Sequence, residues 1–297
     1  MRRSIALLIM LCVAVAACNS GGTGGGTTGG STIPTETPAG ASVAPAAITW
    51  ERAPNAVVVR LDRLIGEESE LDRLNRLPAC TLFGDGRVVW VNTIPPQGEE
   101  LLEGYIEEVT FRTFLEFLIR DVQFYDIPDY AAQELPPAKD SAMEIISVVI
   151  NGETRTIRSY KSWKNNAYVT ILEHCRTLAQ QPALFIPDGA WVTVYEIPRE
   201  VDRAFDYWSP AAPFSLAEVA ATKTAIWASD VAVRELWIKN RQTLSQLQWL
   251  EGDKSYRVAL QVPLISRDAP PAPILPTPEP TPDNSPPLTP PPLATRG

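Results

Sequence analysis

Alternation of apolar and polar residues predicts three β-hairpins. Residues 145–160 place two alternating arms around Asn151-Gly152, a pair that favours the positive φ angles of a type I′ turn. A second hairpin is predicted over 81–92, with its turn at Gly84-Asp85-Gly86, and a third over 246–264, with its turn at 251–254. Two further runs, 56–61 and 190–197, are predicted to be single strands.

Apolar residues recur every three or four positions in two segments, which is the spacing of one helix face. In the first segment the apolar stripe consists of Phe111, Phe114, Leu115, Leu118 and Val122. We expect Thr110 to be the N-cap of this helix and Val109 to form a hydrophobic staple with Phe114. The second stripe is Tyr168, Ile171, Leu172, Cys175 and Ala179. A shorter helix is expected over 215–224 with Ser215 as N-cap, whereas Leu101–Thr110 fits neither strand nor helix well.

These elements predict the fold class. Hairpins outnumber strand-helix-strand units, so we expect an α+β fold: a mainly antiparallel, hairpin-rich sheet with two or three helices packed on one face. The globular domain is expected to span residues 47–265, with a subdomain seam near 198–213.

The N-terminus has the pattern of an export signal. Arg2 and Arg3 precede an apolar run, Ile5–Ala17, that is too short to span a bilayer core of about 30 Å. The run ends in Val15-Ala16-Ala17-Cys18, which resembles the lipobox of bacterial lipoproteins. The resemblance implies that residues 1–17 are removed and that the Cys18 thiol carries a diacylglycerol anchor; the alternative is an ordinary signal peptide that happens to abut a cysteine.

Two low-complexity segments flank the predicted domain. Residues 18–46 begin with the lipidated cysteine and continue as a Gly/Thr/Pro-rich tether, which as a flexible coil would span roughly 30 Å. Residues 266–297 are rich in proline, which disfavours helix and sheet and favours extended polyproline II. This tail is interpreted either as a spacer or docking peptide, or as a disordered terminus with no partner.

Composition excludes several classes of function. The 297 residues include 26 Lys and Arg against 35 Asp and Glu, so the net charge of −9 argues against nucleic-acid binding. The chain has one histidine and four cysteines, too few for a typical catalytic zinc site, and no metal or other cofactor is expected. Among motifs, there is no G-x-S-x-G, H-E-x-x-H or C-x-x-C.

Two cysteines remain in the predicted domain. Cys80 begins a predicted strand and Cys175 lies on the apolar stripe of its helix, so both should face the layer between sheet and helix. In an exported protein this arrangement favours a disulfide over free thiols. His174 is adjacent to Cys175, about 100° away on the helix, so the two are badly placed as a catalytic dyad, and a partly buried structural role is expected for His174.

Carboxylate chemistry stays open as an alternative. The acidic run Glu67–Asp72, Glu99-Glu100, Glu107-Glu108 and Asp202 are candidates for a glycosidase-like acid/base pair. Each is explained more simply as a solvated charge.

Eight tryptophans are available for a core or a binding surface. Trp90, Trp191, Trp237 and Trp249 lie in alternating runs and are expected in the core. Trp163 and Trp208 lie in polar or proline-bounded loops and are candidates for a binding surface, together with Tyr160, Lys161 and Asn165; the competing interpretation is that they cover a core.

Together these features predict a lipid-anchored extracytoplasmic protein that binds or scaffolds at the cell envelope without catalysis. Its membrane contact would be the Cys18 lipid, and its partner an envelope protein or glycan. The alternative is a carboxylate-dependent hydrolase of envelope glycans. An enzyme should show two carboxylates converging in a cleft, a binding module an exposed aromatic patch, and a pure spacer neither.

Overall fold

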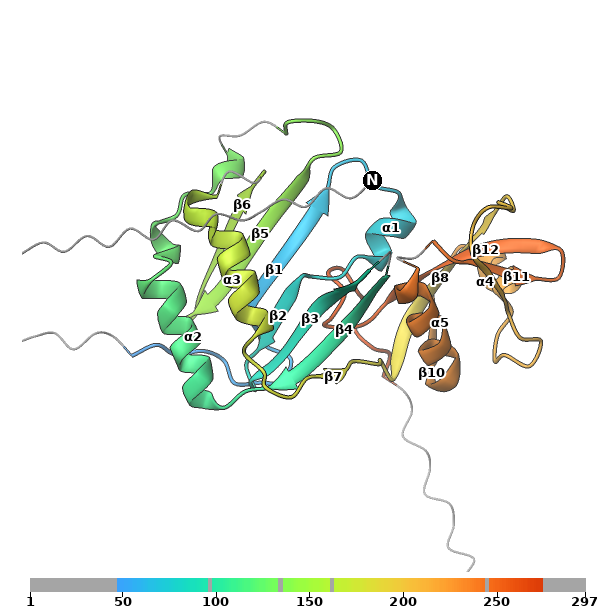
Figure 1. Ribbon diagram of the computed structural model, residues 1–297. Helices are drawn as coiled ribbons and strands as arrows, with labels where there is room; N and C mark the ends of the chain where they lie inside the picture. The colour runs from blue at the N-terminus through green and yellow to red at the C-terminus, as the bar shows by residue number, and fades with distance from the viewer. Residues whose placement is uncertain (1–46, 96–97, 133–135, 161–162, 244–245, 275–297) are drawn as a thin grey trace, which may run out of the picture. The chain divides into compact units, whose positions relative to one another are not determined.

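The computed structural model describes residues 47–274, apart from 96–97, 133–135, 161–162 and 244–245. Over these residues, twelve strands form two sheets, and five α-helices accompany them (Figure 1). The predicted α+β class is confirmed, but the strands divide between two sheets where the sequence predicted one. The predicted signal peptide, Cys18, the tether and most of the tail lie outside the described residues.

Sheet A contains seven strands, all antiparallel to their neighbours. The predicted hairpins at 81–92 and 145–160 both form in it, and Asn151 and Gly152 adopt the expected positive φ angles of 56° and 76°. In spatial order the strands are β6 (Glu153–Ser159), β5 (Ala142–Ile150), β1 (Val57–Ile65), β2 (Cys80–Phe83), β3 (Arg87–Ile94), β4 (Gly98–Tyr105) and β7 (Ala183–Leu184).

Helices α2 (Glu108–Arg120) and α3 (Ala167–Arg176) cover one face of sheet A (Figure 1). Both predicted apolar stripes point into the core beneath them, where Phe111, Phe114, Ile171 and Cys175 are buried against β1, β2 and β5. The sulfur atoms of Cys175 on α3 and Cys80 on β2 lie at disulfide distance, and both side chains are fully buried. This link joins the helical layer to the middle of the sheet.

The start of α2 differs from the prediction. The helix begins at Glu108, with Glu107 as N-cap, so Thr110 lies inside the first turn, and Val109 is exposed and forms no staple with Phe114. Two glutamates at this end interact favourably with the positive end of the helix dipole, which accounts for the earlier start.

Sheet B contains five strands, in the order β10 (Ile226–Ser229), β8 (Gly189–Ile197), β12 (Lys254–Gln261), β11 (Gln248–Glu251) and β9 (Phe205–Tyr207). The predicted hairpin at 246–264 forms β11 and β12, and only β9 runs parallel to its neighbour. Helix α4 (Leu216–Thr222) begins at the predicted N-cap, since the Ser215 hydroxyl accepts from Glu218 N. Helix α5 (Asp230–Gln242) was not predicted, and it contains Trp237, expected in a strand.

A second apolar core joins the two sheets. The inner face of sheet B and the buried side of α5 contribute Val192, Val258, Leu236 and Trp237, and the opposite face of sheet A contributes Phe83, Val89 and Leu101. The chain passes from sheet A to sheet B between β7 and β8, at residues 185–188. The segment 198–213, near which a subdomain seam was predicted, follows β8 and contains β9, both of which belong to sheet B.

After β12 the chain returns to sheet A. The Arg60 guanidinium on β1 donates to the Ile265 carbonyl at 2.9 Å, and Arg267 donates to the buried Asp62 carboxylate at 2.7 Å. These bonds hold the residues that follow β12 against the middle of sheet A. Among the described residues, none of the helices combines the length and the hydrophobicity that a membrane span needs.

The buried disulfide yields a prediction. Replacing both cysteines (Cys80→Ala with Cys175→Ala) should lower the free energy of unfolding by ~2–5 kcal/mol, because a cross-link that closes a long loop restricts the unfolded chain. Urea unfolding of the full chain measures the change. Free thiols at both positions, alkylated in the native exported protein, would contradict the linkage.

Candidate functional site

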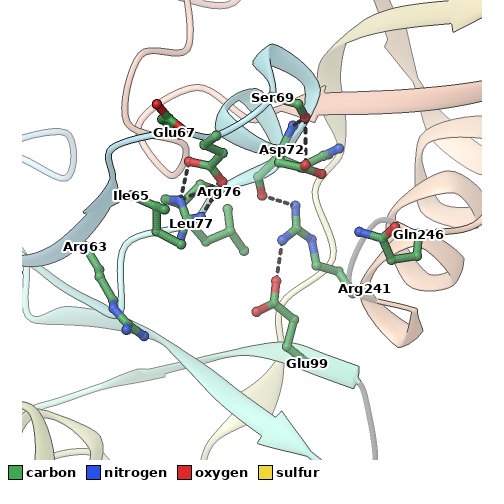
Figure 2. Close-up of a pocket in the computed structure, with 12 residues that line it drawn as sticks. Arg63, Ile65, Glu67, Ser69, Asp72, Arg76, Leu77, Glu99, Arg241 and Gln246 are labelled. Atoms are coloured by element: carbon green, nitrogen blue, oxygen red, sulfur yellow. Dashed lines mark hydrogen bonds and ion pairs between the residues drawn. The ribbon is translucent and has the colours of Figure 1, made fainter. Parts of the chain in front are cut away.

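A pocket of about 580 Å³ lies where the two sheets meet (Figure 2). Its walls come from helix α1 (Glu70–Asn75) and the segment before it, from Glu99 on β4, and from Arg241 on α5. The pocket therefore collects residues that are more than 160 positions apart in the chain, and most of its lining is polar or charged.

The acidic run predicted as a solvated face builds helix α1. The Ser69 hydroxyl accepts from Asp72 N at 3.1 Å and donates to the Asp72 carboxylate at 2.6 Å, which is an N-cap of the kind that serine favours. Glu70 and Asp72 lie in the first turn, where negative charge is stabilised by the helix dipole. The run therefore starts the short helix that lines the pocket.

Three carboxylates at the pocket are paired with arginines. Glu68 accepts from Arg76 Nε at 3.0 and 3.1 Å, and Asp72 accepts from Arg257 at 2.8 Å. Glu99 accepts from Arg241 Nη1 at 2.5 Å. The fourth carboxylate, Glu67, is exposed and lies 3.3 Å from Lys139. The pocket is thus a cluster of ion pairs, and three of its four carboxylates are held by guanidinium groups.

Arg241 is the most deeply buried of these charges. Its Nη2 donates to the Asn75 carbonyl at 2.6 Å, and its guanidinium lies 4.8 Å from the centre of the Trp237 ring. Burial lowers the pKa of Arg241 and the Glu99 carboxylate raises it. Arginine stays charged in proteins, so a buried guanidinium needs partners that compensate its charge. Arg241 belongs to α5, and its partners belong to α1 and β4.

Two asparagines bond to the backbone of β12 next to Arg241. We call Arg241, its partners Glu99 and Asn75, and Asn240 the joint between the two sheets. Asn75 donates to the Val258 carbonyl at 3.0 Å and accepts from Leu260 N at 3.0 Å, as a neighbouring strand would. Asn240 also donates to Val258 O, at 3.1 Å, and accepts from the Trp249 indole at 3.1 Å. The part of β12 that extends beyond β11 is therefore satisfied by side chains from α1 and α5.

The pocket brings together only some of the predicted carboxylates. Glu67, Glu68, Asp72 and Glu99 line it. Glu100 pairs with Asn92 at 2.7 Å, and Asp202 lines a second pocket of about 500 Å³. Glu107 caps α2, and the Glu108 carboxylate next to it accepts hydrogen bonds from Arg52 and Arg112, which lower its pKa to about 2. The helix end and the pocket are separate sites.

The two tryptophans named as candidates for a binding surface are buried, which agrees with the competing interpretation that they cover a core. Trp163 and Trp208 are only 8% and 5% exposed, and they belong to different cores. Their indole nitrogens donate to Glu144 at 2.8 Å and to the Phe214 carbonyl at 2.8 Å, so both act as lids over apolar residues. Around Trp163, Tyr160 is half-buried, Asn165 is exposed, and Lys161 lies outside the described residues. Position in a polar loop did not reveal that the rings fold back.

His174 also departs from its predicted place. It is exposed, and its ring centre lies 4.3 Å from that of Phe117 on α2. Trp191 differs from the other tryptophans expected in the core, because it is half-buried on the outer face of sheet B. Trp90, Trp237 and Trp249 are buried as expected.

An exposed aromatic patch occurs where none was predicted. Phe205 and Tyr207 on the edge strand β9 are 47% and 66% exposed, with ring centres 5.8 Å apart in an edge-to-face arrangement. The Arg199 guanidinium lies 5.6 Å from the Phe205 ring. We call Phe205, Tyr207 and Arg199 the β9 patch. Its signal in the sequence is the alternation Phe205-Asp206-Tyr207, immediately before Trp208.

The contacts of Asp206 hold this strand in place. Its carboxylate accepts from Tyr207 N at 2.8 Å and forms an ion pair with Lys239 on α5, which lowers the pKa of Asp206. Backbone bonds from Gln248 N to Ala204 O and from Trp208 N to Leu250 O show that even-numbered residues face β11. The backbone groups of Phe205 and Tyr207 therefore face away from β11, and of these the Tyr207 N–H is already bonded to the Asp206 carboxylate.

Comparisons with known proteins add no family to this geometry: no protein-family model, curated protein or solved structure matches the chain. Within the ranges that the structure describes, no three His, Cys, Asp or Glu side chains lie close enough together to hold a metal ion. The pocket and the β9 patch are therefore interpreted from their own contacts.

The buried joint yields a second prediction, with a matched control in the same chain. Arg241→Gln should lower the free energy of unfolding by ~3–5 kcal/mol, because it leaves Glu99 and the Asn75 carbonyl without their cation. Arg52→Gln breaks a similarly short Arg–Glu pair on the surface, which should change stability far less, because solvent screens an exposed ion pair. Chemical denaturation of both variants measures the difference, and similar values would show that Arg241 does not hold the joint.

Proposed function

We propose that this chain is a lipid-anchored extracytoplasmic protein that binds a partner of the cell envelope and performs no catalysis. The anchor is proposed from Val15-Ala16-Ala17-Cys18, in which the last three residues of the apolar run of the predicted signal peptide are followed by a cysteine. The pairing of Cys80 with Cys175 supports an oxidising compartment, because buried disulfides persist mainly in exported proteins.

The β9 patch is the observation that carries the binding function. Large aromatic side chains are usually buried, and Phe205 and Tyr207 stand together on a strand that, among the described residues, pairs on one side only. The Phe205 N–H and the carbonyls of Phe205 and Tyr207 face outward, whereas the Tyr207 N–H is bonded to Asp206. An extended segment of a partner can therefore pair with β9 through these three groups while its side chains contact the rings. The partner that fits this surface is an envelope protein that offers an extended strand. A glycan would contact the aromatic rings but could not pair with the backbone of β9 as a strand does.

Binding is favoured over hydrolysis by the state of the carboxylates. A glycosidase needs one carboxyl group to donate a proton and a second to act as base or nucleophile. In the pocket, Glu68, Asp72 and Glu99 are each bonded to an arginine. The bonds of Arg241 to Glu99 and to the Asn75 carbonyl also connect the two sheets. Because these carboxylates are held in ion pairs with a structural role, they are poorly suited to act as general acid or base. This supports a binding function over hydrolysis.

The anchor is tested by fractionation of cells that express the full chain. Cys18→Ser should move the protein from the membrane fraction to the soluble extracytoplasmic fraction and abolish labelling by a palmitate analogue, because the thiol that takes the lipid is gone. Cys12→Ser, inside the same apolar run, is the control and should leave both unchanged. Retention of membrane association and label by Cys18→Ser would refute the lipid anchor.

The binding surface is tested by photo-cross-linking in cells. A photoreactive amino acid in place of Tyr207 should give a discrete cross-linked product that mass spectrometry identifies as an envelope protein. The same substitution at Tyr105, which is 67% exposed against 66% for Tyr207, is the matched control and should give none. Identical products at both positions, or no product at Tyr207, would exclude the β9 patch as the contact.

A further inference from the structure

Two tryptophans lie side by side on the outer face of sheet B. Trp191 on β8 and Trp227 on β10 are partners in strand register, and their ring centres are 5.6 Å apart with the planes at 71°. The residues that flank Trp191, Ala190 and Val192, point into the second core. By alternation along the strand, Trp191 is turned away from that core, and both indoles remain half-buried.

A glycine fixes the orientation of the Trp227 ring. A Cβ atom at Gly189 would lie 2.3 Å from Cζ2 of Trp227, so the ring rests directly on the backbone of β8. Any side chain at this position would push the ring away. The two indoles therefore form an aromatic platform in which the Trp227 ring lies on the backbone of β8.

The segment after β12 lies against this platform. The Trp191 indole N–H donates to the Pro271 carbonyl at 3.1 Å, and Gln261 Nε2 donates to the Asp268 carbonyl at 3.3 Å. Gln261 and Trp191 are themselves register partners on adjacent strands. Thus two carbonyls three residues apart accept hydrogen bonds from two neighbouring side chains of sheet B.

The chemistry of this segment suits an aromatic platform. Residues 269–274 read Ala-Pro-Pro-Ala-Pro-Ile, and each proline fixes its own φ angle and offers a carbonyl but no N–H. Aromatic grooves recognise such segments through the flat faces of the rings and through donors to the exposed carbonyls. Ala269 and Pro273 are half-buried, whereas Pro270, Pro271 and Ile274 are exposed, so the segment meets the platform through the bond from the Trp191 indole to the Pro271 carbonyl.

We propose that Trp191 and Trp227 form a binding site for proline-rich segments, and that its resident ligand is this chain's own segment 269–274. This site lies on different residues from the β9 patch and does not rest on the function proposed for it. Residues 262–268 are held to β1 by Arg60 and Arg267, and this position places the following segment 269–274 next to the platform. Further prolines follow at 276–292, so the tail contains other sequences of the same class.

The test uses the full chain, in which the site is filled, and a full-length variant in which it is emptied by Pro270→Ser, Pro271→Ser and Pro273→Ser. The indole N–H signal of Trp191 is identified by its loss in Trp191→Phe. In the triple variant this N–H should exchange with solvent about fivefold to tenfold faster than in the wild type, because without the fixed φ angles of the prolines the segment no longer holds the carbonyl of residue 271 against the indole. Near-UV circular dichroism checks that both proteins are folded.

The ligand is then supplied as a synthetic peptide of residues 268–283. It should shift the Trp191 and Trp227 signals of the triple variant in a saturable way, whereas the wild type should need at least roughly tenfold more peptide, since its tethered segment acts at about millimolar effective concentration. Adding Trp191→Phe to the triple variant should weaken peptide binding by about fivefold, because the ring remains but the N–H donor is lost. A peptide with serine at the three proline positions is the control.

Three results would overturn the proposal. The folded triple variant could fail to bind the peptide, the wild type could bind it as tightly as the triple variant, or the added Trp191→Phe could leave the affinity unchanged. The first would show that the platform has no affinity for proline-rich chains. The second would show that segment 269–274 does not occupy it, and the third that the Trp191 indole does not hold the ligand.

Discussion

The buried guanidinium of Arg241 is the interaction on which the arrangement of the two sheets depends. A charge in the interior is stable only when its partners surround it, and here they come from two elements, Glu99 on β4 and the carbonyl of Asn75 on α1. Arg241 itself sits on α5, which packs with sheet B. The requirement to satisfy one cation thus fixes α5 against sheet A, in a way that apolar contacts alone would specify less sharply.

The rest of the molecule agrees with this constraint. The shared apolar core brings Phe83, Val89 and Leu101 of sheet A against Trp237 of α5, and the returning chain adds the bond between Arg267 and Asp62. Apolar burial supplies most of the free energy, but it is non-directional and tolerates sliding. The polar contacts set the register, and the pocket of Figure 2 is the space left where charged side chains meet at the joint.

The sequence predicted what local chemistry decides and missed what distant contacts decide. The Asn151-Gly152 hairpin and the Ser215 cap were predicted because turn and cap residues act over a few positions. Helix α5 was missed because its inward face carries Asn240 and Arg241, which interrupt the apolar stripe until their distant partners are known. The division into two sheets and the burial of Trp163 and Trp208 depend in the same way on contacts that no local pattern encodes. The carboxylates of the pocket were identified as candidates, but their arginine partners were not.

Three consecutive residues at the end of α5 connect the joint to the proposed binding surface. Lys239 pairs with Asp206 on β9, Asn240 bonds to β12 and Trp249, and Arg241 reaches α1 and β4. Side chains of successive helix residues point about 100° apart, so three consecutive residues of α5 can contact three different parts of the structure. The edge strand β9 is only three residues long, yet it is held by the same helix turn that fixes sheet A. A partner that pairs with β9 would therefore meet a strand already in position, so less ordering entropy would be lost on binding and the short contact would be more effective.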